Sequence, residues 1–310
     1  MTTEPENTIL AIHPGALGDL VLFAQFLQPM RAGRTIRLVA GKSKAQLLQG
    51  LGAVQETLDY DLLPLEQLFN SQGTAARLAA LLGQCRTLVS CFAGEDTAVQ
   101  GRLMRLCGAT RAMFLPVRPP SDFQGHLLEY WSQMVGSPTP APPAWTAPAP
   151  WRQAALSQLA AIGCQPGQCG LAVLQPGAGS PLKCWPLERF LELAGELRRG
   201  GLTPLLVLGP TETEWWPGGL IESCRRRCSL VQDAPLPILA GLLAQARVFV
   251  GNDSGPGHLA AALGCNVVSL FGPGDPRQFA PRGKVRLLQA NDLGQLDVST
   301  VLQAVGELLD

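Results

Sequence analysis

The stretch Arg247-Val-Phe-Val-Gly-Asn-Asp-Ser-Gly-Pro-Gly-His258 constrains the fold more than any other part of the chain. Its apolar start, rich in Val and Phe, predicts a buried strand, and the Ala- and Leu-rich continuation after His258 predicts a helix. Between them lies a polar turn that contains Gly255 and Gly257. A helix that begins where a strand ends directs its first N–H groups at whatever binds there, so this stretch predicts a phosphate site.

A similar arrangement occurs near the N-terminus, in Ile9-Leu-Ala-Ile-His-Pro-Gly-Ala-Leu-Gly-Asp-Leu20. Two strand–loop–helix sites, one in each half, predict two α/β domains that face each other across a cleft. The length of 310 residues is long for one core and comfortable for two domains of about 150 residues. Short β-type runs alternate with longer helical runs in both halves, which is typical of parallel sheets with helices on both faces.

The domain boundaries follow from a proline-dense stretch with almost no charge, which reads as a stiff connector over residues 138–150. We expect a first domain over 1–137 and a second over 151–295. A C-terminal amphipathic helix over 296–310 could pack back on the first domain. The expected strands lie near 8–13, 35–40, 54–58, 87–92, 111–115, 170–175, 203–208, 229–232, 247–250, 266–271 and 285–288.

The composition excludes several classes of function. Lys plus Arg and Asp plus Glu are both 24, so no global field attracts nucleic acid. Charged residues make up 15% and hydrophobic residues 46% of the chain, which favours a large buried core over disorder. The sequence has neither a membrane-spanning apolar run nor the features of a signal peptide, so we expect a cytoplasmic protein. The nine scattered cysteines read as reduced, buried thiols rather than zinc ligands or disulfides.

The C-terminal motif carries five candidate residues for donor binding, namely Asp253, Ser254, Gly255, Gly257 and His258. The hydroxyl of Ser254, the imidazole of His258 and the first helical amides could together hold the anion, and the two glycines would let it approach the backbone. An alternative is that Asp253 or Ser254 only caps the helix. The run from Gly255 to Ala260 also matches G-x-G-x-x-A, a dinucleotide-binding variant that normally follows the first strand of its domain.

A second loop, Gln175-Pro-Gly-Ala-Gly-Ser-Pro-Leu-Lys-Cys-Trp-Pro186, contains Gly177, Gly179 and a single cation, Lys183. On a glycine-rich loop that faces a phosphate, one lysine could neutralise a leaving diphosphate without a metal. The alternative is a solvated surface lysine. Glu212 follows another strand end and could accept hydrogen bonds from ribose hydroxyls, a role that Glu214 could equally fill.

The N-terminal motif contains Gly18, a further candidate for donor binding, and Asp19 at the start of an apolar helix. Asp19 could act as a general base towards a sugar hydroxyl, or it could only cap the helix, where a carboxylate interacts well with the helix dipole. His13 could bind an acidic group on an acceptor, although a packed structural histidine is the alternative. Arg102 and Arg105 belong to a stretch without acids that could face an anionic acceptor.

Asp59-Tyr-Asp61 formally spells the metal-binding D-x-D motif of many sugar transferases. It lies far from the phosphate loops in the sequence and directly before a predicted helix. We therefore expect no metal.

Taken together, three features in this order resemble glycosyltransferase family 9, the lipopolysaccharide heptosyltransferases. They are Asp19 after Gly-x-x-Gly, Lys183 before x-Trp-Pro, and Asp-Ser-Gly-Pro-x-His followed by Leu-Phe-Gly-Pro-Gly-Asp-Pro276. The resemblance implies a GT-B fold and an inverting transfer without metal or other cofactor, with ADP-heptose as donor. The implied acceptor is an anionic or lipid-linked glycan, so transient contact with the inner face of the inner membrane is also implied.

Carried over by position, the resemblance assigns a role to each motif residue. Asp19 corresponds to the catalytic base and Lys183 to the lysine that contacts phosphate. Glu212 corresponds to the acid beside the donor ribose, and Asp253 to His258 correspond to the donor-binding loop. Around Ser90-Cys-Phe-Ala-Gly-Glu-Asp96 the usual acceptor-side pattern is not found.

Two other classes of function compete with a sugar transferase. One is a nucleotide-sugar epimerase or a dehydrogenase that would use the 255–260 loop. The other is a non-catalytic protein that only binds nucleotide sugars. Acceptor-dependent release of ADP from ADP-heptose would separate the transferase from both.

Overall fold

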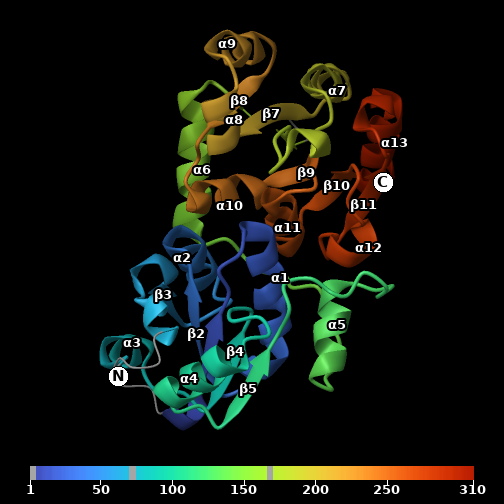
Figure 1. Cartoon of the computed structure of the whole chain (residues 1–310). Coiled ribbons are helices and arrows are strands. Elements are labelled where there is room, and N and C mark those ends of the chain that lie inside the picture. Colours follow the sequence, from blue (N-terminus) through green and yellow to red (C-terminus); the bar gives the residue numbers. More distant parts are fainter. Residues whose placement is uncertain (1–4, 70–74, 166–169) are drawn as a thin grey trace. The chain divides into compact units, whose positions relative to one another are not determined.

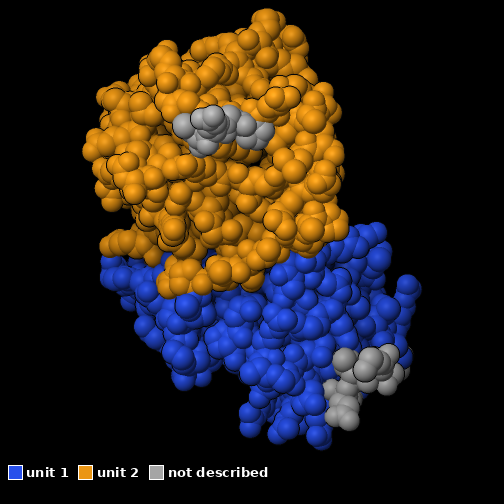
Figure 2. Space-filling model, turned by 180° about the vertical axis from the view of Figure 1, so that it is seen from behind, with its two compact units in different colours: residues 1–141 blue, residues 142–310 orange. Residues whose placement is uncertain are grey.

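The computed structural model describes residues 5–69, 75–165 and 170–310. The chain forms two compact units, residues 1–141 and residues 142–310 (Figure 2). Each unit contains one parallel β-sheet with helices packed against it (Figure 1). The division between the units falls inside the connector expected over residues 138–150.

The sheet of the first unit has five parallel strands in the order β3-β2-β1-β4-β5. All five occur where the sequence predicts them, within about two residues at their ends. Their bounds are β1 Thr8–Ile12, β2 Thr35–Ala40, β3 Glu56–Asp59, β4 Thr87–Ser90 and β5 Arg111–Phe114. β1 lies between β2 and β4, and every residue of β1 is buried, as expected for a strand covered on both faces.

The helices of the first unit cover the sheet by their apolar faces. One cluster joins β1 and β4 to α3, α4 and the short helix η4 through residues such as Leu10, Leu78 and Leu103. Trp131 of α5 packs its indole edge-on against Phe23 and Phe26 of α1. The bounds are α1 Leu17–Leu27, α2 Lys42–Gly50, α3 Ala76–Leu82, α4 Thr97–Cys107, α5 Leu127–Met134, and the 3-10 helices η1 Pro5–Asn7, η2 Gln28–Arg31, η3 Tyr60–Leu62 and η4 Leu65–Leu68.

Gln25 on α1 gives a prediction for stability. Its side chain is 1% exposed, and neither its amide nitrogen nor its amide oxygen has a hydrogen-bond partner among the described residues. A buried polar group without a partner costs about 1–3 kcal/mol. We therefore expect Gln25→Met to raise the free energy of unfolding by about 1 kcal/mol in urea denaturation.

Gln28, three residues further on, supplies the matched control. Its Nε2 donates to the backbone oxygens of Ala24 and Ala53, at 3.3 and 3.2 Å. Gln28→Met removes both hydrogen bonds and should lower the free energy of unfolding. A Gln25→Met variant that unfolds at a lower urea concentration than the wild type would contradict the interpretation.

The sheet of the second unit has six parallel strands in the order β11-β10-β9-β6-β7-β8. All six were expected from the sequence. Their bounds are β6 Leu171–Gln175, β7 Thr203–Leu208, β8 Ser229–Gln232, β9 Ala246–Asn252, β10 Asn266–Phe271 and β11 Val285–Gln289.

The helices of the second unit include α13, whose packing partner the sequence left open. Its buried residues Val301 and Val305 join the core cluster formed with α7 and the sheet. α6 begins at Ala149, so the last two residues of the expected connector already belong to a helix, whose first turn tolerates proline. The bounds are α6 Ala149–Ala161, α7 Leu187–Arg199, α8 Pro210–Trp215, α9 Gly218–Arg227, α10 Leu236–Leu243, α11 Gly255–Ala262, α12 Pro276–Phe279, α13 Val298–Leu309, and the 3-10 helices η5 Pro181–Lys183 and η6 Leu293–Gln295.

Both sheets contain a point at which the strand order reverses, and these points place the sites. In the first unit the chain proceeds outward from β1 to β3 and then restarts on the other side at β4. In the second unit it proceeds from β6 to β8 and restarts at β9. Ligands of such sheets bind beyond the carboxyl ends of the strands at this reversal. We therefore expect the functional sites in the loops after β1, β4, β6 and β9.

Across the described ranges, none of the helices combines the length and the apolar character needed to cross a membrane.

Candidate functional site

The start of α11 in the second unit brings several of the predicted residues together. Ser254 precedes the helix with an extended backbone, and its side chain does not cap α11. Its hydroxyl instead donates a hydrogen bond to Gln175 Oε1 over 2.7 Å. The carboxylate of Asp253 accepts a hydrogen bond from Lys183 Nζ. Neither bond caps the helix, so both side chains connect the loop after β9 to the loop after β6.

Lys183 and Asp253 form an ion pair, with 2.7 Å between Nζ and Oδ2. The lysine side chain is 39% exposed and the aspartate side chain 15%. A pair with one partner this exposed contributes little to stability. The ion pair instead fixes a position. It holds the ammonium group of Lys183, the last residue of η5, beside Asp253, which lies just before α11.

Glu212 lies close to Gly177 in the loop after β6. It is the third residue of α8, it is buried, and its Oε2 accepts a hydrogen bond from Gly209 N over 2.7 Å. Burial raises the pKa of Glu212, while the hydrogen bond from the Gly209 amide acts in the opposite direction. Gly177 lies directly against this carboxylate. The sequence reasoning placed both residues at one site, and the structure brings them together.

Gly177 and Gly179 make a matched pair for a test of this packing. A Cβ on Gly177 would lie 1.7 Å from Glu212 Oε1, whereas a Cβ on Gly179 would meet nothing within 4 Å. Gly177→Ala must therefore displace the loop or Glu212, and overpacking of this kind costs about 1–3 kcal/mol. We expect Gly177→Ala to lower the melting temperature and Gly179→Ala to leave it unchanged. Equal melting temperatures for the two variants would contradict the observed contact.

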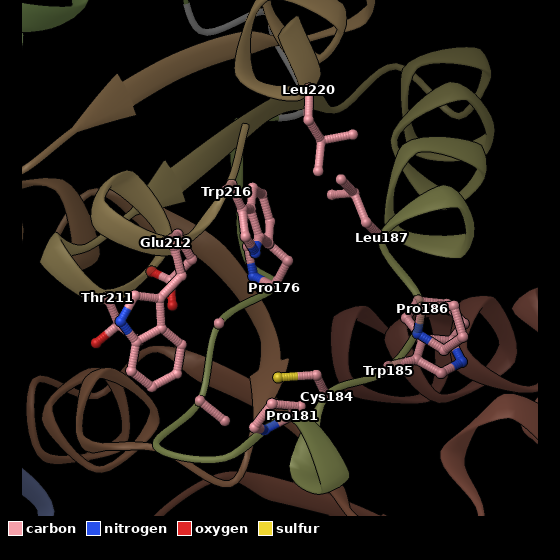
Figure 3. Close-up of a pocket in the computed structure, with 13 residues that line it drawn as sticks. Pro176, Pro181, Cys184, Trp185, Pro186, Leu187, Thr211, Glu212, Trp216 and Leu220 are labelled. Carbon is pink, nitrogen blue, oxygen red and sulfur yellow. The ribbon is translucent and has the colours of Figure 1, made fainter. Parts of the chain in front are cut away.

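A pocket of about 260 Å³ lies between the loop after β6 and the α8–α9 segment (Figure 3). Pro176, Pro181 and Cys184 line it from the loop. On the other side lie Trp216 and Leu220, and the carboxylate of Glu212 is the acidic group in the lining. The pocket is thus largely apolar, with few polar groups, which is the composition of many small-molecule sites.

The remaining residues of the C-terminal motif form the first turn of α11. Gly255 and Gly257 belong to the helix, and His258 is buried within it. The match to a dinucleotide fingerprint is not in the usual position, because α11 follows β9, whereas that fingerprint follows the first strand of its domain. This placement weakens the dehydrogenase alternative.

The first unit has its own cluster at the end of β1. Asp19 lies in the first turn of α1, where its Oδ2 accepts a hydrogen bond from Ala16 N over 3.1 Å, and Gly18 is buried beside it. The position of Asp19 thus includes the capping contact that the sequence offered as an alternative. Its half-buried carboxylate also lies close enough to Cys91, after β4, to help burial raise the pKa of that thiol. Asp19 therefore lies at the strand reversal of its sheet.

His13 supports the loop that leads to Asp19. Its Nδ1 accepts a hydrogen bond from Gly15 N over 3.0 Å, and the ring is 1% exposed. Lys44 donates a hydrogen bond to Gly15 O over 2.7 Å. Burial, aided by the charge of Lys44, lowers the pKa of His13 from 6.5 to about 4. A buried, neutral ring favours a role in shaping this loop over the contact with an anionic acceptor that the sequence allowed.

The shifted pKa of His13 predicts an acid-sensitive fold. The unfolded chain binds the proton near pH 6.5 and the folded chain only near pH 4. Stability is therefore complete above pH 6.5 and declines as the pH falls towards 4, by about 3 kcal/mol if the whole shift is realised. We expect His13→Asn, which keeps an acceptor for Gly15 N, to flatten this decline in urea titrations. Identical slopes for variant and wild type across that range would contradict it.

The arginines suggested for an acceptor lie on α4. Arg102 is half-buried and Arg105 is exposed in the last turn of the helix. The Nε atom of Arg102 is buried and has no hydrogen-bond partner within the described segments. Arg102 and Arg105 therefore share a helix, while the residues described near Asp19 belong to the loop after β1, to α2 and to the segment that follows β4.

Residues 5–69, 75–165 and 170–310 contain no group of three or more His, Cys, Asp or Glu side chains that could hold a metal ion. In the D-x-D motif, Asp59 Oδ1 accepts a hydrogen bond from Asp61 N and caps η3. The eight cysteines in the described ranges are free thiols, and Cys169 lies outside these ranges.

Sequence reasoning missed Gln175, Asn252 and Lys44. Gln175 and Asn252 are the last residues of β6 and β9, and both are buried. A polar residue that ends an otherwise apolar strand was the available signal, since its backbone is in the sheet while its side chain reaches the loops. Lys44 had no such signal, because its contact with Gly15 joins residues far apart in the sequence.

Comparison with known proteins gives a consistent family. Residues 129–296 match the model of glycosyltransferase family 9 (heptosyltransferase). A segment of 109 residues is 33% identical to lipopolysaccharide heptosyltransferase 3 of Escherichia coli strain K12 and covers 33% of this chain and 31% of that protein. The chain thus spans about a third of the length of the curated relatives that it matches.

Solved structures resemble the chain over nearly its whole length. A family 9 glycosyl transferase from Veillonella parvula DSM 2008 has a TM-score of 0.79 and 18% identity, and the match covers 99% of this chain and 98% of that one. The ADP-heptose lps heptosyltransferase II of E. coli has a TM-score of 0.74 and 19% identity, with 97% and 98% covered. At these identities the likeness concerns the fold, and it confirms the predicted GT-B class with two Rossmann-like domains.

Proposed function

Because the chain belongs to glycosyltransferase family 9, we propose that it transfers heptose from ADP-heptose to a glycan acceptor of the lipopolysaccharide core or a related surface glycan. The observation that carries this proposal is the arrangement at the strand reversal of the second unit. There Lys183, held by Asp253, lies beside the start of α11. A cation and a helix N-terminus at one point suit a diphosphate leaving group.

The donor would be distributed over the loops of the second unit. The diphosphate lies at Ser254, Gly255, Gly257 and His258, with Gly179 leaving room for it. Glu212 accepts hydrogen bonds from the ribose hydroxyls, and the apolar pocket beside Glu212 offers a surface for the nucleoside. One structural neighbour is an ADP-heptose heptosyltransferase, which supports adenine as the base.

In the proposed reaction Asp19 is the general base. The acceptor hydroxyl gives its proton to the Asp19 carboxylate while its oxygen forms a bond to the anomeric carbon. The bond from that carbon to the diphosphate oxygen breaks on the opposite face, so the configuration inverts. The bonding electron pair leaves with ADP, whose charge Lys183 and the first amides of α11 receive. This step uses side chains and backbone amides of this chain and no metal.

Arg105, exposed on α4, and the neighbouring Arg102 supply positive charge to the first unit and would favour an anionic or lipid-linked glycan. Such an acceptor would bring the protein from the cytoplasm to the inner face of the inner membrane for each transfer. No nucleic acid partner is proposed.

The experiment that tests this function incubates the protein with ADP-heptose and lipopolysaccharide core acceptors and measures ADP release. The proposal predicts ADP release that requires an acceptor. Parallel reactions with GDP-, UDP- and TDP-sugars test the choice of base. Conversion of the nucleotide sugar without ADP release would favour an epimerase or dehydrogenase, and binding without any conversion would favour a non-catalytic binder.

A further inference from the structure

The loop over residues 176–186 carries Lys183, yet it contains little regular structure of its own. Its single helical segment is the 3-10 turn η5. The tip is not held by apolar burial either, because Leu182 is 79% exposed. The position of the lysine must therefore be determined by contacts between this loop and the neighbouring strands.

Asn252, the last residue of β9, holds both ends of the loop. Its side-chain Nδ2 donates a hydrogen bond to Pro176 O over 2.7 Å, and its Oδ1 accepts one from Trp185 N over 2.9 Å. The side chain is fully buried, with 0% exposure. An amide suits this position, since its nitrogen donates to a carbonyl while its oxygen accepts from an N–H on the other side.

The Trp185 end of the loop is also fixed in the core. The indole is buried, it packs edge-on against Phe190, and its Nε1 donates to Leu296 O over 2.8 Å. Asn252 thus ties the start of the loop, at Pro176, to the end that is anchored at Trp185. The chain between the two ends can then adopt fewer conformations.

Gly272 supports the loop at Lys183 itself. It directly follows β10, and a Cβ at this position would lie 3.0 Å from Leu182 O and 3.7 Å from Lys183 Cα. The backbone that carries the lysine therefore rests against the Cα atom of Gly272. This explains a glycine of the Phe271-Gly272-Pro273-Gly274 motif to which the donor chemistry gives no role.

We propose that Asn252 and Gly272 are positioning residues of the donor site, which fix the loop over residues 176–186 so that Lys183 meets the diphosphate. The inference rests on the proposed function for its consequence, although the loop geometry is independent of it. Asp253, the ion-pair partner of Lys183, directly follows Asn252. One strand end therefore sets both the loop and the partner of its lysine.

Asn252→Asp is the most informative variant. The aspartate has the shape of asparagine and still accepts the hydrogen bond from Trp185 N. Its second oxygen, however, cannot donate to Pro176 O. We expect the Kd for ADP, measured by titration calorimetry, to rise about ten-fold. Asn266→Asp is the matched control, since Asn266 is also a strand residue whose Nδ2 donates to a backbone oxygen, that of Arg247, at 3.0 Å. The control should bind ADP as the wild type does.

If Asn252→Asp folds poorly, the variant Gly272→Ala and a double-mutant cycle with Lys183→Met still test the proposal. Gly272→Ala should also weaken ADP binding several-fold, because its methyl group displaces Leu182 and Lys183. Either change should lose most of its effect on ADP affinity when it is added to Lys183→Met, since a positioning residue acts mainly through the lysine. An undiminished effect in the Lys183→Met background would overturn the proposal.

Hydrogen exchange separates this proposal from the proposed function. In Asn252→Ala the backbone amides of residues 176–186 should exchange faster than in the wild type, with Asn266→Ala unchanged. Unchanged exchange of this loop would overturn the positioning role whether or not ADP binds. If the wild type binds no ADP while the loop exchange responds as expected, the positioning role stands and the proposed function fails.

Discussion

Replacing Asp19 with asparagine should reduce turnover by about 10²- to 10⁴-fold, the range expected for loss of a general base. The affinity for ADP-heptose should stay within about two-fold of the wild type, because Lys183, Glu212 and the start of α11, which would hold the donor, belong to the second unit. Asparagine can still accept the hydrogen bond that Ala16 N now donates to Asp19 Oδ2. The first turn of α1 should therefore remain intact, and the loss should appear in kcat in steady-state assays of ADP release.

Asp96 offers a control with the same local chemistry. Its Oδ1 accepts a hydrogen bond from Val99 N over 3.0 Å and caps α4, in the same unit as Asp19. Asp96→Asn should leave turnover nearly unchanged. Full turnover in Asp19→Asn would show that the carboxylate only stabilises the helix, as the capping alternative holds, and that another group takes the acceptor proton.

Lys183→Met should reduce kcat/KM by about 10²- to 10³-fold, the size of effect seen when one group that stabilises a developing anion is removed. The variant loses the cation beside α11 and also leaves the carboxylate of Asp253 facing the donor. Both changes disfavour a diphosphate, so we expect KM for ADP-heptose to rise as kcat falls. Lys284→Met, on an exposed residue of the same unit, should be without effect.

The double variant Lys183→Met with Asp253→Asn tests how the pair works. The two side chains lie 2.7 Å apart, so removing the lysine alone leaves one negative charge at the donor site. Removing both charges should restore part of the ADP affinity lost in Lys183→Met. If the double variant binds ADP more weakly than Lys183→Met, Asp253 must contact the donor directly rather than mainly hold the lysine.

Much of the fold could be predicted from the sequence because parallel α/β architecture leaves local signals. Most strands in the described part of the chain are short apolar runs bounded by polar or glycine-bearing segments. The polar β3 is the exception, and each strand occurs near its predicted position. The connector was visible because prolines exclude regular structure, except at Ala149 and Pro150, which begin α6. The packing of α13 could not be predicted, since the apolar face of a helix does not indicate which surface it packs against.

The candidate site was predictable to the extent that its residues lie in motifs. Lys183, Asp253 and Ser254 were identified, and the structure joins the first two in an ion pair. The partners of these residues were not identified, because Gln175 and Asn252 act across strands that are adjacent in space and distant in sequence. His13 shows the same limit, since its burial and lowered pKa depend on the packing around the loop and on Lys44.

The central claim is that a diphosphate is received at the start of α11 and at Lys183. A crystal structure of the protein with ADP-heptose tests it most directly. The account predicts phosphate oxygens within hydrogen-bond distance of Lys183 Nζ and of backbone amides among residues 254–258. Diphosphate density elsewhere, with Lys183 still bound only to Asp253, would contradict it.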